Sequence, residues 1–258
     1  MKNELMKNDP KRRTVLVTGG GRGIGAACSL LCAAQGWAVA VNYASDAAAA
    51  RSVVARIRAD GGTALDVQAD VANEEQVLAM FATVDHDLPP LGALINNAGV
   101  VDLASRVDAM SLQRLQRMFA INVFGSFVCA REAVKRMSTL HGGKGGAIVN
   151  VSSVASRLGS PGLYVDYAAS KAAIDTFTLG LAREVAAEGI RVNAVRPGII
   201  ETEIHASGGQ ADRVAQITPQ LPMQRAGTAD EVAQAIAWLL SDAASYTTGA
   251  LLDVSGGR

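Results

Sequence analysis

The chain has 258 residues, of which 49% are hydrophobic and 19% are charged, and its 24 basic residues balance 24 acidic ones. This length and apolar content suit one domain with a large core and leave no room for a second catalytic module. A surface that tracks nucleic acid needs a basic excess, so the balanced charge argues against a nucleic-acid partner.

The amino-terminal residues 1–13 are polar and basic. They lack the apolar stretch of a signal peptide or a membrane anchor. We therefore expect a disordered tail at 1–13, a single domain at 14–258, a cytoplasmic protein and no membrane partner.

A β-branched run at 14–18, a glycine-rich turn at 19–25 and an alanine-rich helical segment at 26–35 follow one another. A strand, a glycine turn and a helix in this order present free backbone N–H groups and the positive end of a helix to a phosphate. The alternative is a flexible surface loop. A Walker-type phosphate loop is excluded because no Gly-Lys-Ser/Thr follows the glycines.

Apolar runs and helical segments alternate along the rest of the chain. The expected strands are 38–41, 64–67, 93–95, 147–151, 190–195 and 251–254, and the expected helices are 47–60, 74–86, 112–137, 167–187 and 230–240. Strands that are apolar throughout are typical of a parallel sheet covered on both faces. The pattern predicts an α/β fold, a Rossmann-type doubly wound parallel sheet of about seven strands flanked by helices, which binds ligands at the carboxyl ends of its strands.

Tyr167 and Lys171 are spaced so that both side chains share one face of the expected helix. A neighbouring cation in a poorly hydrated cleft lowers the pKa of a phenol from its ordinary value of about 10. Tyr167 would then act as a general acid or base on a substrate oxygen. The spacing by itself is also common on solvated helix faces, so this hypothesis depends on the other motifs.

Three motifs occur in a fixed order: Thr18-Gly-Gly-Gly-Arg-Gly-Ile-Gly25, Asn96-Asn97-Ala98-Gly99, and Tyr167 with Lys171. Together they resemble the signatures of the short-chain dehydrogenase/reductase family, and the chain is similar to the branch that holds glucose dehydrogenases and β-ketoacyl-carrier-protein reductases. The resemblance extends from residue 14 to the carboxyl end. It implies an oxidoreductase that transfers a hydride between NADP(H) and a carbonyl or alcohol substrate.

The resemblance assigns four catalytic residues. Ser153 would hydrogen-bond the substrate oxygen, Tyr167 would exchange the proton, and Lys171 would lower the pKa of Tyr167 while holding the nicotinamide ribose. Asn122 would anchor a water molecule that links Lys171 to solvent. Ser152 is the competing serine, but the family position matches Ser153.

The resemblance also implies which residues contact the cofactor. They follow the ends of successive strands and comprise Gly19, Gly21, Arg22, Gly23, Ile24, Gly25, Asn42, Tyr43, Ser45, Asp70, Val71, Asn97, Ala98, Gly99, Pro197, Gly198, Ile200 and Thr202, together with Tyr167 and Lys171. Residues 41–45 offer no carboxylate to a ribose, and Arg22 can pair with a 2′-phosphate, so NADP(H) is favoured. NAD(H) stays possible, because Asp46 directly follows this segment and a shift of one residue could place its carboxylate near the ribose. The position of Asp46 more naturally caps the helix at 47–60.

The expected substrate pocket holds Val154, Leu158, Tyr164, Ile199 and His205, with a solvent-facing His205 as the alternative. This set carries few charges and favours a small neutral ketone, aldehyde or sugar over a charged acyl carrier. Gly208, Gly209, Pro219 and Pro222 predict a substrate lid near 203–222. The family resemblance implies a homotetramer.

Metal and disulfide chemistry find no support in the sequence. His86, His141 and His205 are isolated, so we expect no metal site. The odd count of three cysteines favours reduced, buried thiols. The alternative to an enzyme is a non-catalytic nucleotide-binding regulatory protein on the same fold, whose signature would be a damaged catalytic set, whereas all four residues are present.

Overall fold

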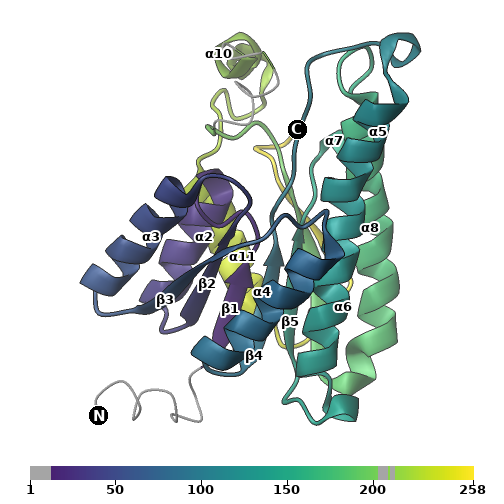
Figure 1. The fold of residues 1–258 in the computed structure, drawn as a ribbon. Coiled ribbons are helices and arrows are strands. Elements are labelled where there is room, and N and C mark those ends of the chain that lie inside the picture. Colours follow the sequence, from purple (N-terminus) through teal and green to yellow (C-terminus); the bar gives the residue numbers. More distant parts are fainter. Residues whose placement is uncertain (1–12, 203–208, 210–212) are drawn as a thin grey trace.

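A seven-stranded parallel sheet lies at the centre of the molecule, with helices on both of its faces (Figure 1). The computed structural model describes residues 13–202, 209 and 213–258. The strand order is β3-β2-β1-β4-β5-β6-β7. The strands are β1 (Thr14–Val17), β2 (Ala38–Tyr43), β3 (Thr63–Gln68), β4 (Leu91–Asn96), β5 (Gly146–Val151), β6 (Ile190–Pro197) and β7 (Leu251–Val254).

Helices connect the strands. The α-helices are α2 (Gly23–Ala34), α3 (Ala47–Ala59), α4 (Glu74–Asp87), α5 (Leu112–Phe119), α6 (Gly125–Met137), α7 (Ala155–Leu158), α8 (Val165–Val185), α10 (Arg213–Ile217) and α11 (Ala229–Leu240). A π-helical turn, η2 (Ala120–Phe124), joins α5 to α6. Short 3₁₀ turns are η1 (Val107–Ala109), η3 (Thr139–His141), η4 (Ala186–Glu188), η5 (Thr218–Gln220) and η6 (Asp242–Ala244).

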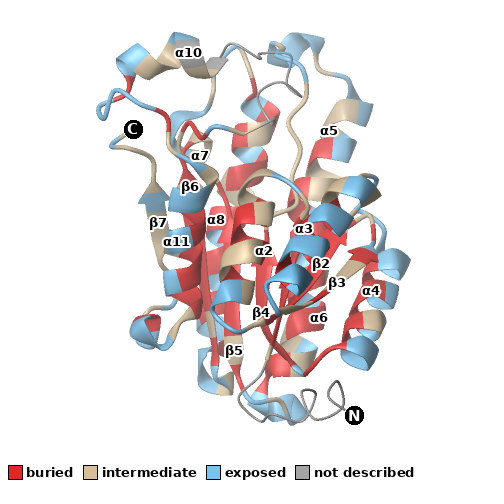
Figure 2. Ribbon diagram, turned by 90° about the vertical axis from the view of Figure 1, so that its left-hand side faces the viewer, coloured by how far each residue is buried: buried red, intermediate tan, exposed pale blue. Residues whose placement is uncertain are grey.

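The sheet separates two apolar cores. Successive strand residues point to opposite faces, so Val15 and Val17 pack with α2, α3 and α11, whereas Leu16 packs with α4, α6 and α8. Buried residues accordingly fill the strands and the inward faces of the helices (Figure 2). This double burial explains why the strands are apolar throughout.

Side chains at the starts of several helices satisfy backbone N–H groups there. Asp46 accepts from Ala49 N at 3.0 Å, Asn73 accepts from Gln76 N at 3.1 Å, and Thr228 forms a capping box with Glu231. Asp46 therefore caps α3, in agreement with the more natural of its two expected roles.

The predicted fold class is confirmed, and one predicted element differs. The segment 112–137, expected as one helix, consists of α5, the π-helical turn and α6. A π turn inserts extra backbone without changing the apolar composition around it, so the periodicity of the sequence does not reveal it. The three cysteines are free and buried, and burial raises the pKa of Cys32 and of Cys129 to about 12.

The division into a tail at 1–13 and a domain at 14–258 stays a prediction, because residues 1–12 lie outside the described part of the chain. Across the described residues, no helix has both the length and the apolar character that a membrane span requires.

Candidate active site

A cavity of about 510 Å³ opens at the carboxyl ends of the central strands. Its walls come from segments that directly follow β1, β4, β5 and β6, and from the start of α8. Ligands bind at this edge in open α/β sheets, because the loops after the strands converge there. The residues that line the cavity include ten of the predicted site residues: Ile24, Asn97, Gly99, Ser153, Tyr167, Lys171, Pro197, Gly198, Ile200 and Thr202.

Ser153, Tyr167 and Lys171 meet in this cavity. Ser153 follows β5, and its Oγ accepts a hydrogen bond from Ala155 N at 3.1 Å. A hydrogen bond from Ser153 to Tyr167 opposes the rise in the tyrosine pKa. Tyr167 and Lys171 lie one turn apart near the start of α8, and Lys171 Nζ is 5.6 Å from the centroid of the Tyr167 ring.

Burial sets the protonation states of these two side chains. It raises the pKa of Tyr167, against the weaker effect of the Ser153 hydrogen bond. It lowers the pKa of Lys171 to about 8, and Asp175 opposes this shift. At neutral pH the site thus holds a neutral phenol beside an ammonium group, and the expected lowering of the Tyr167 pKa by Lys171 does not occur among the described residues.

Lys171 and Asn122 approach each other beside Gly99. Lys171 Nζ donates to Val151 O at 2.8 Å. A Cβ atom at Gly99 would lie 3.4 Å from Lys171 Nζ and 3.4 Å from Asn122 Oδ1. The side chain of Asn122 lies in the π-helical turn, where it accepts from Val100 N at 2.8 Å and donates to Ser170 Oγ at 3.1 Å. All four predicted catalytic residues therefore lie together.

Ser152 has a structural environment. Its side chain is buried, and its Oγ donates to the carbonyl of Lys171 at 3.1 Å. This bond fixes the end of β5 against α8, whereas the hydroxyl of Ser153 lies beside that of Tyr167. The geometry favours Ser153 over Ser152.

The glycine turn has the backbone that a pyrophosphate needs. Gly19 has φ +62°, and a Cβ atom at Gly25 would lie 2.2 Å from Gly19 O. Asn97 Nδ2 holds this turn by donating to Thr18 O at 2.9 Å and to Gly19 O at 3.1 Å. The residue before α2, Arg22, makes no side-chain cap, which leaves the first-turn N–H groups of this helix available to a phosphate.

The far wall of the site also fits a dinucleotide. A Cβ atom at Gly23 would lie 3.3 Å from Thr202 Cγ2, so Thr202 stands over the start of α2. Gly198 leaves no space for a side chain, because its Cβ would lie 2.8 Å from Ser255 Cα. These residues fit the family cofactor, which would lie between the turn and this wall.

Two predicted cofactor residues, Asn42 of β2 and Arg22 before α2, use their side chains on contacts within the protein. Asn42 is buried; its Nδ2 donates to Ala69 O at 3.0 Å and its Oδ1 accepts from Gly19 N at 3.2 Å. Its amide therefore supports the glycine turn from behind. Arg22 Nε lies 3.8 Å from Asp46 Oδ2, which places a cation and a carboxylate together beside Tyr43 and Ser45.

Asp70 and Val71 follow β3. Asp70 Oδ1 accepts from Ala72 N at 2.9 Å, and Val71 is buried against Gly125. Gly21 packs tightly on α3, since its Cβ would lie 3.0 Å from Ala50 N, and Ala98 N donates to Thr18 Oγ1 at 3.0 Å. These positions shape the wall beside the glycine turn.

The predicted substrate pocket is largely brought together. Val154, Leu158, Tyr164 and Ile199 line the cavity, whereas His205 lies outside the described residues. The expected lid at 203–222 is described only at 209 and 213–222, where Val214 and Ile217 of α10 pack with Ile199 and Leu221.

Sequence reasoning missed several residues that line the cavity. The turn Ser160, Pro161 and Leu163 precedes Tyr164, and its Gly159-Ser160-Pro161-Gly162 composition is a signal that could have been used. Arg258, the last residue, carries no such signal. It reaches the cavity because β7 ends beside α7, where Arg157 Nη2 donates to Arg258 O at 3.2 Å.

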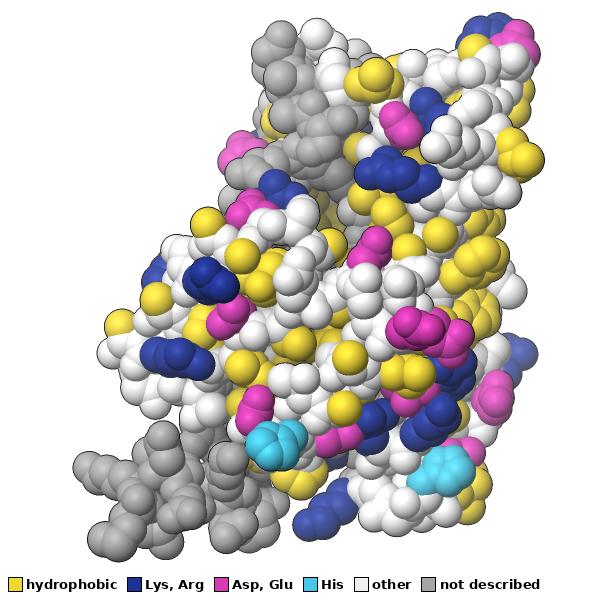
Figure 3. Space-filling model, viewed as in Figure 1, with side chains coloured by type: hydrophobic (Ala, Val, Ile, Leu, Met, Phe, Trp, Pro, Cys, Tyr) yellow, Lys and Arg dark blue, Asp and Glu magenta, His cyan; other side chains and the backbone are white. Residues whose placement is uncertain are grey.

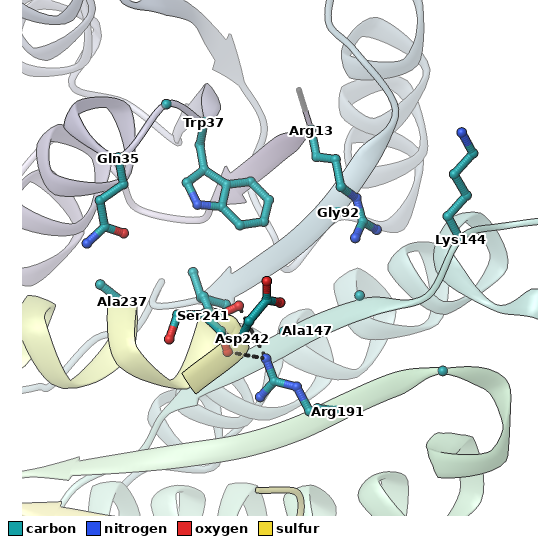
Figure 4. A pocket seen from close by; sticks show the side chains of 14 residues that line it. Arg13, Gln35, Trp37, Gly92, Lys144, Ala147, Arg191, Ala237, Ser241 and Asp242 are labelled. Atoms are coloured by element: carbon teal, nitrogen blue, oxygen red, sulfur yellow. Dashed lines mark hydrogen bonds between the residues drawn. The ribbon is translucent and has the colours of Figure 1, made fainter. Parts of the chain in front are cut away.

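A second cavity of about 530 Å³ lies at the amino ends of the strands and is lined by Arg13, Trp37, Lys144 and Arg191 (Figure 4). Arg191 donates to Leu239 O at 2.6 Å and to Leu240 O and Ser241 O at 3.2 Å, so it caps the end of α11. Arg13 donates to Gly145 O. These arginines hold the ends of elements in place, and the cavity contains none of the predicted site residues.

Comparison with known proteins identifies the family. A family model described as enoyl-(acyl carrier protein) reductase matches residues 19–258. The chain is 58% identical to the uncharacterized oxidoreductase YgfF of Escherichia coli (strain K12), over 94% of this chain and 98% of that protein. The chain belongs to the short-chain dehydrogenase/reductase family. The predicted family is confirmed, and with it an oxidoreductase of a family that binds NAD(P).

Other relatives within this short-chain dehydrogenase/reductase family are named for different substrates. The 3beta-hydroxysteroid dehydrogenase 1 of Eggerthella lenta is 41% identical, over 98% of this chain and 95% of that protein. A 3-oxoacyl-[acyl-carrier-protein] reductase of Synechocystis is 39% identical, over 95% and 96%. A solved short chain dehydrogenase of Burkholderia cenocepacia J2315, in complex with NADP, has a TM-score of 0.87 and 33% identity, over 95% of this chain and 97% of that one.

Proposed function

We propose that this protein is an NADP(H)-dependent carbonyl reductase or alcohol dehydrogenase in which Tyr167 exchanges the proton with the substrate oxygen. The observation that carries the proposal is the convergence of Ser153, Tyr167 and Lys171 in one cavity, with Asn122 behind Lys171. A full catalytic set of this kind also argues against a non-catalytic regulatory protein.

Each residue of the proposed catalytic set has a separate role in the reaction. Bound NADP(H) supplies or accepts the hydride at the substrate carbon. Ser153 Oγ is oriented by Ala155 N, which supports its role as a donor to the substrate oxygen. Tyr167 retains its proton at neutral pH and can give it to the oxygen in reduction.

Lys171 supports the phenolate that remains after this transfer. Its ammonium carries charge below a pH of about 8, and its bond to Val151 O keeps it beside Tyr167. In the oxidative direction the phenol must first lose its proton. The raised pKa of Tyr167 therefore favours reduction at neutral pH and oxidation at higher pH.

We propose NADP(H) over NAD(H) on charge. Arg22 directly precedes α2, and its contact at 3.8 Å with Asp46, which follows β2, is solvent-exposed and hence weak. A dianionic 2′-phosphate offers Arg22 a stronger partner than one carboxylate. The Burkholderia relative in complex with NADP supports this choice.

Apart from Lys171 and Arg258, the described residues that line the cavity are uncharged, which supports a neutral carbonyl substrate. Val154, Leu158, Ile199 and Tyr164 give it apolar walls, and its volume of about 510 Å³ suits a small molecule. A ketone, aldehyde or sugar fits such walls better than a charged acyl carrier does. Residues near 203–222 would close over this substrate as a lid.

The test is a screen of NADPH and NADH consumption with neutral ketones, aldehydes and aldoses. We expect turnover with at least one class, and a fall of about 10²- to 10⁴-fold in kcat for Tyr167→Phe while NADPH still binds. Tyr164→Phe removes a hydroxyl from the same cavity and is the matched control, with kcat within about tenfold of the parent. Undiminished turnover in Tyr167→Phe, or cofactor binding without turnover on any carbonyl, would contradict the proposal.

We also propose a homotetramer. Large apolar side chains are exposed on α5, the π-helical turn, α6 and α8, and they include Leu112, Phe124, Phe127, Val165 and Leu179. Figure 3 shows apolar side chains gathered along the side of the molecule formed by these helices. A contiguous apolar surface of this kind supports a protein interface, and exposed Trp238 and Tyr246 near the carboxyl end support a second one.

A further inference from the structure

A chain of ion pairs lies directly behind the catalytic lysine. Asp175 follows Lys171 by one turn on α8, and its side chain is only 10% exposed. Asp175 Oδ2 accepts a hydrogen bond from Arg196 Nε at 3.0 Å and lies 2.9 Å from Arg196 Nη2 in an ion pair. Arg196, on β6, also lies 3.7 Å from Asp253 Oδ1 on β7.

The contacts of Asp175 leave half of its carboxylate without a hydrogen bond. Nε and Nη2 of Arg196 both contact Oδ2, while Oδ1 is buried and accepts no hydrogen bond from the described residues. A purely structural arginine pair is most stable when both oxygens are engaged. A buried carboxylate oxygen without a donor is costly unless a nearby positive charge compensates for the lost water.

Lys171 is a buried cation one turn before Asp175 on α8. Residues four apart on a helix are neighbours on one face. Asp175 raises the pKa of Lys171, against the larger effect of burial, which lowers it to about 8. Lys171 Nζ is hydrogen-bonded to the neutral carbonyl of Val151, so that bond supplies no negative charge.

The surroundings of Lys171 contain few other charges. Tyr167 and Asp175 lie on α8 with it, β5 contributes the Val151 carbonyl, and β6 contributes Arg196. Arg196 is itself a cation and would oppose the charge on Lys171 if Asp175 did not bind it. Asp253 on β7 binds Arg196 from its other side and Arg157 at 2.9 Å.

We propose that Asp175 is a positioning residue whose carboxylate keeps Lys171 charged at neutral pH, with Arg196 fixing that carboxylate in place. Its effect on turnover rests on the function proposed above, whereas its effect on the charge of Lys171 does not. Asp253 serves as the internal control, because it is the second carboxylate on Arg196 but lies on β7 rather than on the helix that carries Lys171.

The direct experiment follows the ionisation of Lys171 by carbon NMR in protein labelled at the lysine ε-carbon. The chain has six lysines, and Lys171→Arg assigns the signal. We expect Asp175→Asn to lower the Lys171 pKa by about one unit and Asp253→Asn to change it by less than about 0.3. An unchanged value in Asp175→Asn, or an equal fall in both variants, overturns the proposal.

The kinetic experiment separates positioning from damage to the structure. In Asp175→Asn, the pH above which reduction slows should move down with the pKa of Lys171, and activity should recover toward pH 6. A structural defect would lower the rate by a similar factor at every pH. For Asp253→Asn we expect either no change in rate or a uniform fall of this kind. If the parent protein turns over no carbonyl, the proposed function fails, and the NMR titration still decides the role of Asp175.

A second pair of variants covers the case in which Asp175→Asn does not fold. Asp175→Asn combined with Arg196→Met removes both partners of the ion pair together, so neither member of that pair is left as an unpaired charge. Its Lys171 pKa is compared with that of Arg196→Met alone. A lower value in the double variant supports the proposal, and equal values overturn it.

Discussion

Single polar residues at the carboxyl edge of the sheet either face the cavity or hold the residues that do. Asn42, Asn97 and Ser152 use their side chains on backbone groups of the glycine turn and of α8. Ser153 and Tyr167 keep their hydroxyls at the cavity. This division leaves few polar groups for substrate, so each of them should have a large effect when it is changed.

Lys171 is expected to reduce the stability of the protein at neutral pH. Its folded pKa of about 8 lies below the ordinary 10.5, so the folded state binds its proton less well than the unfolded state does. The cost of burying the charged Lys171 side chain is fully present below pH 8 and disappears as the pH rises toward 10.5. Lys171→Met should therefore raise the free energy of unfolding by about 1–2 kcal/mol at pH 7, less than the full effect because Val151 O loses a donor and the buried Asp175 carboxylate loses a neighbouring cation.

Urea unfolding of the parent and of Lys171→Met at pH 7 and pH 9.5 measures this difference. The gain should shrink at the higher pH, and activity should be lost at both. A variant that is less stable than the parent by the same amount at both pH values would contradict the assigned burial cost.

Arg22 is expected to set cofactor preference. Arg22→Ala should raise the KM for NADPH by about tenfold or more and leave the KM for NADH within about threefold, because only NADPH carries the 2′-phosphate. Initial rates with both cofactors give the answer. Arg51→Ala is the control, because it removes an exposed arginine of α3. Equal losses for the two cofactors in Arg22→Ala would refute the 2′-phosphate role.

At the scale of elements, an ion pair fixes the start of the catalytic helix. Asp166 precedes Tyr167 on α8, and its carboxylate is fully buried. Arg114 of α5 binds it through Nε at 2.8 Å and Nη2 at 3.2 Å, and Arg114 Nη1 also donates to Leu103 O. The pair thus joins α5, the loop after β4 and the first turn of α8.

Asp166→Asn should lower the free energy of unfolding by about 3 kcal/mol, since it leaves Arg114 without its buried partner. Asp108→Asn breaks the exposed pair of Asp108 with Arg106 and should cost no more than about 0.5 kcal/mol. Guanidinium unfolding of both variants measures the two costs. Equal losses would show that the buried pair has no special role.

Some of these elements could be predicted from the sequence and others could not. The strands could be predicted because burial on both faces leaves a continuous apolar run, and α3 because Asp46 caps it. The break between α5 and α6 could not, since the π-helical turn depends on contacts of Asn122 with Val100 and Ser170, which lie on other elements.

At the scale of the whole molecule, the apolar side formed by α5, α6 and α8 predicts association. Phe124 is 61% exposed there, and Phe127 stacks on Phe177 at 3.7 Å between ring centroids. Phe124→Glu would place a charge in the proposed interface, so it should shift the assembly to a smaller species. Sedimentation velocity measures the change.

Leu140→Glu is the matched control for this prediction. Leu140 is 76% exposed on η3, outside the apolar side, so its change should leave the assembly intact. A parent protein that sediments as a monomer, or an equal effect of both variants, would contradict the proposed interface.

The sequence by itself determined the alternation of strands and helices and the glycine turn, because these are local patterns with fixed spacing, and its resemblance to the short-chain dehydrogenase/reductase family pointed to the four proposed catalytic residues. The tertiary structure decided which polar side chains face the cavity, that Arg258 reaches it, and that Asp175 and Arg196 lie behind Lys171. The physical reason is that such contacts join segments far apart in the chain, where burial and the orientation of side chains are set by packing across the sheet.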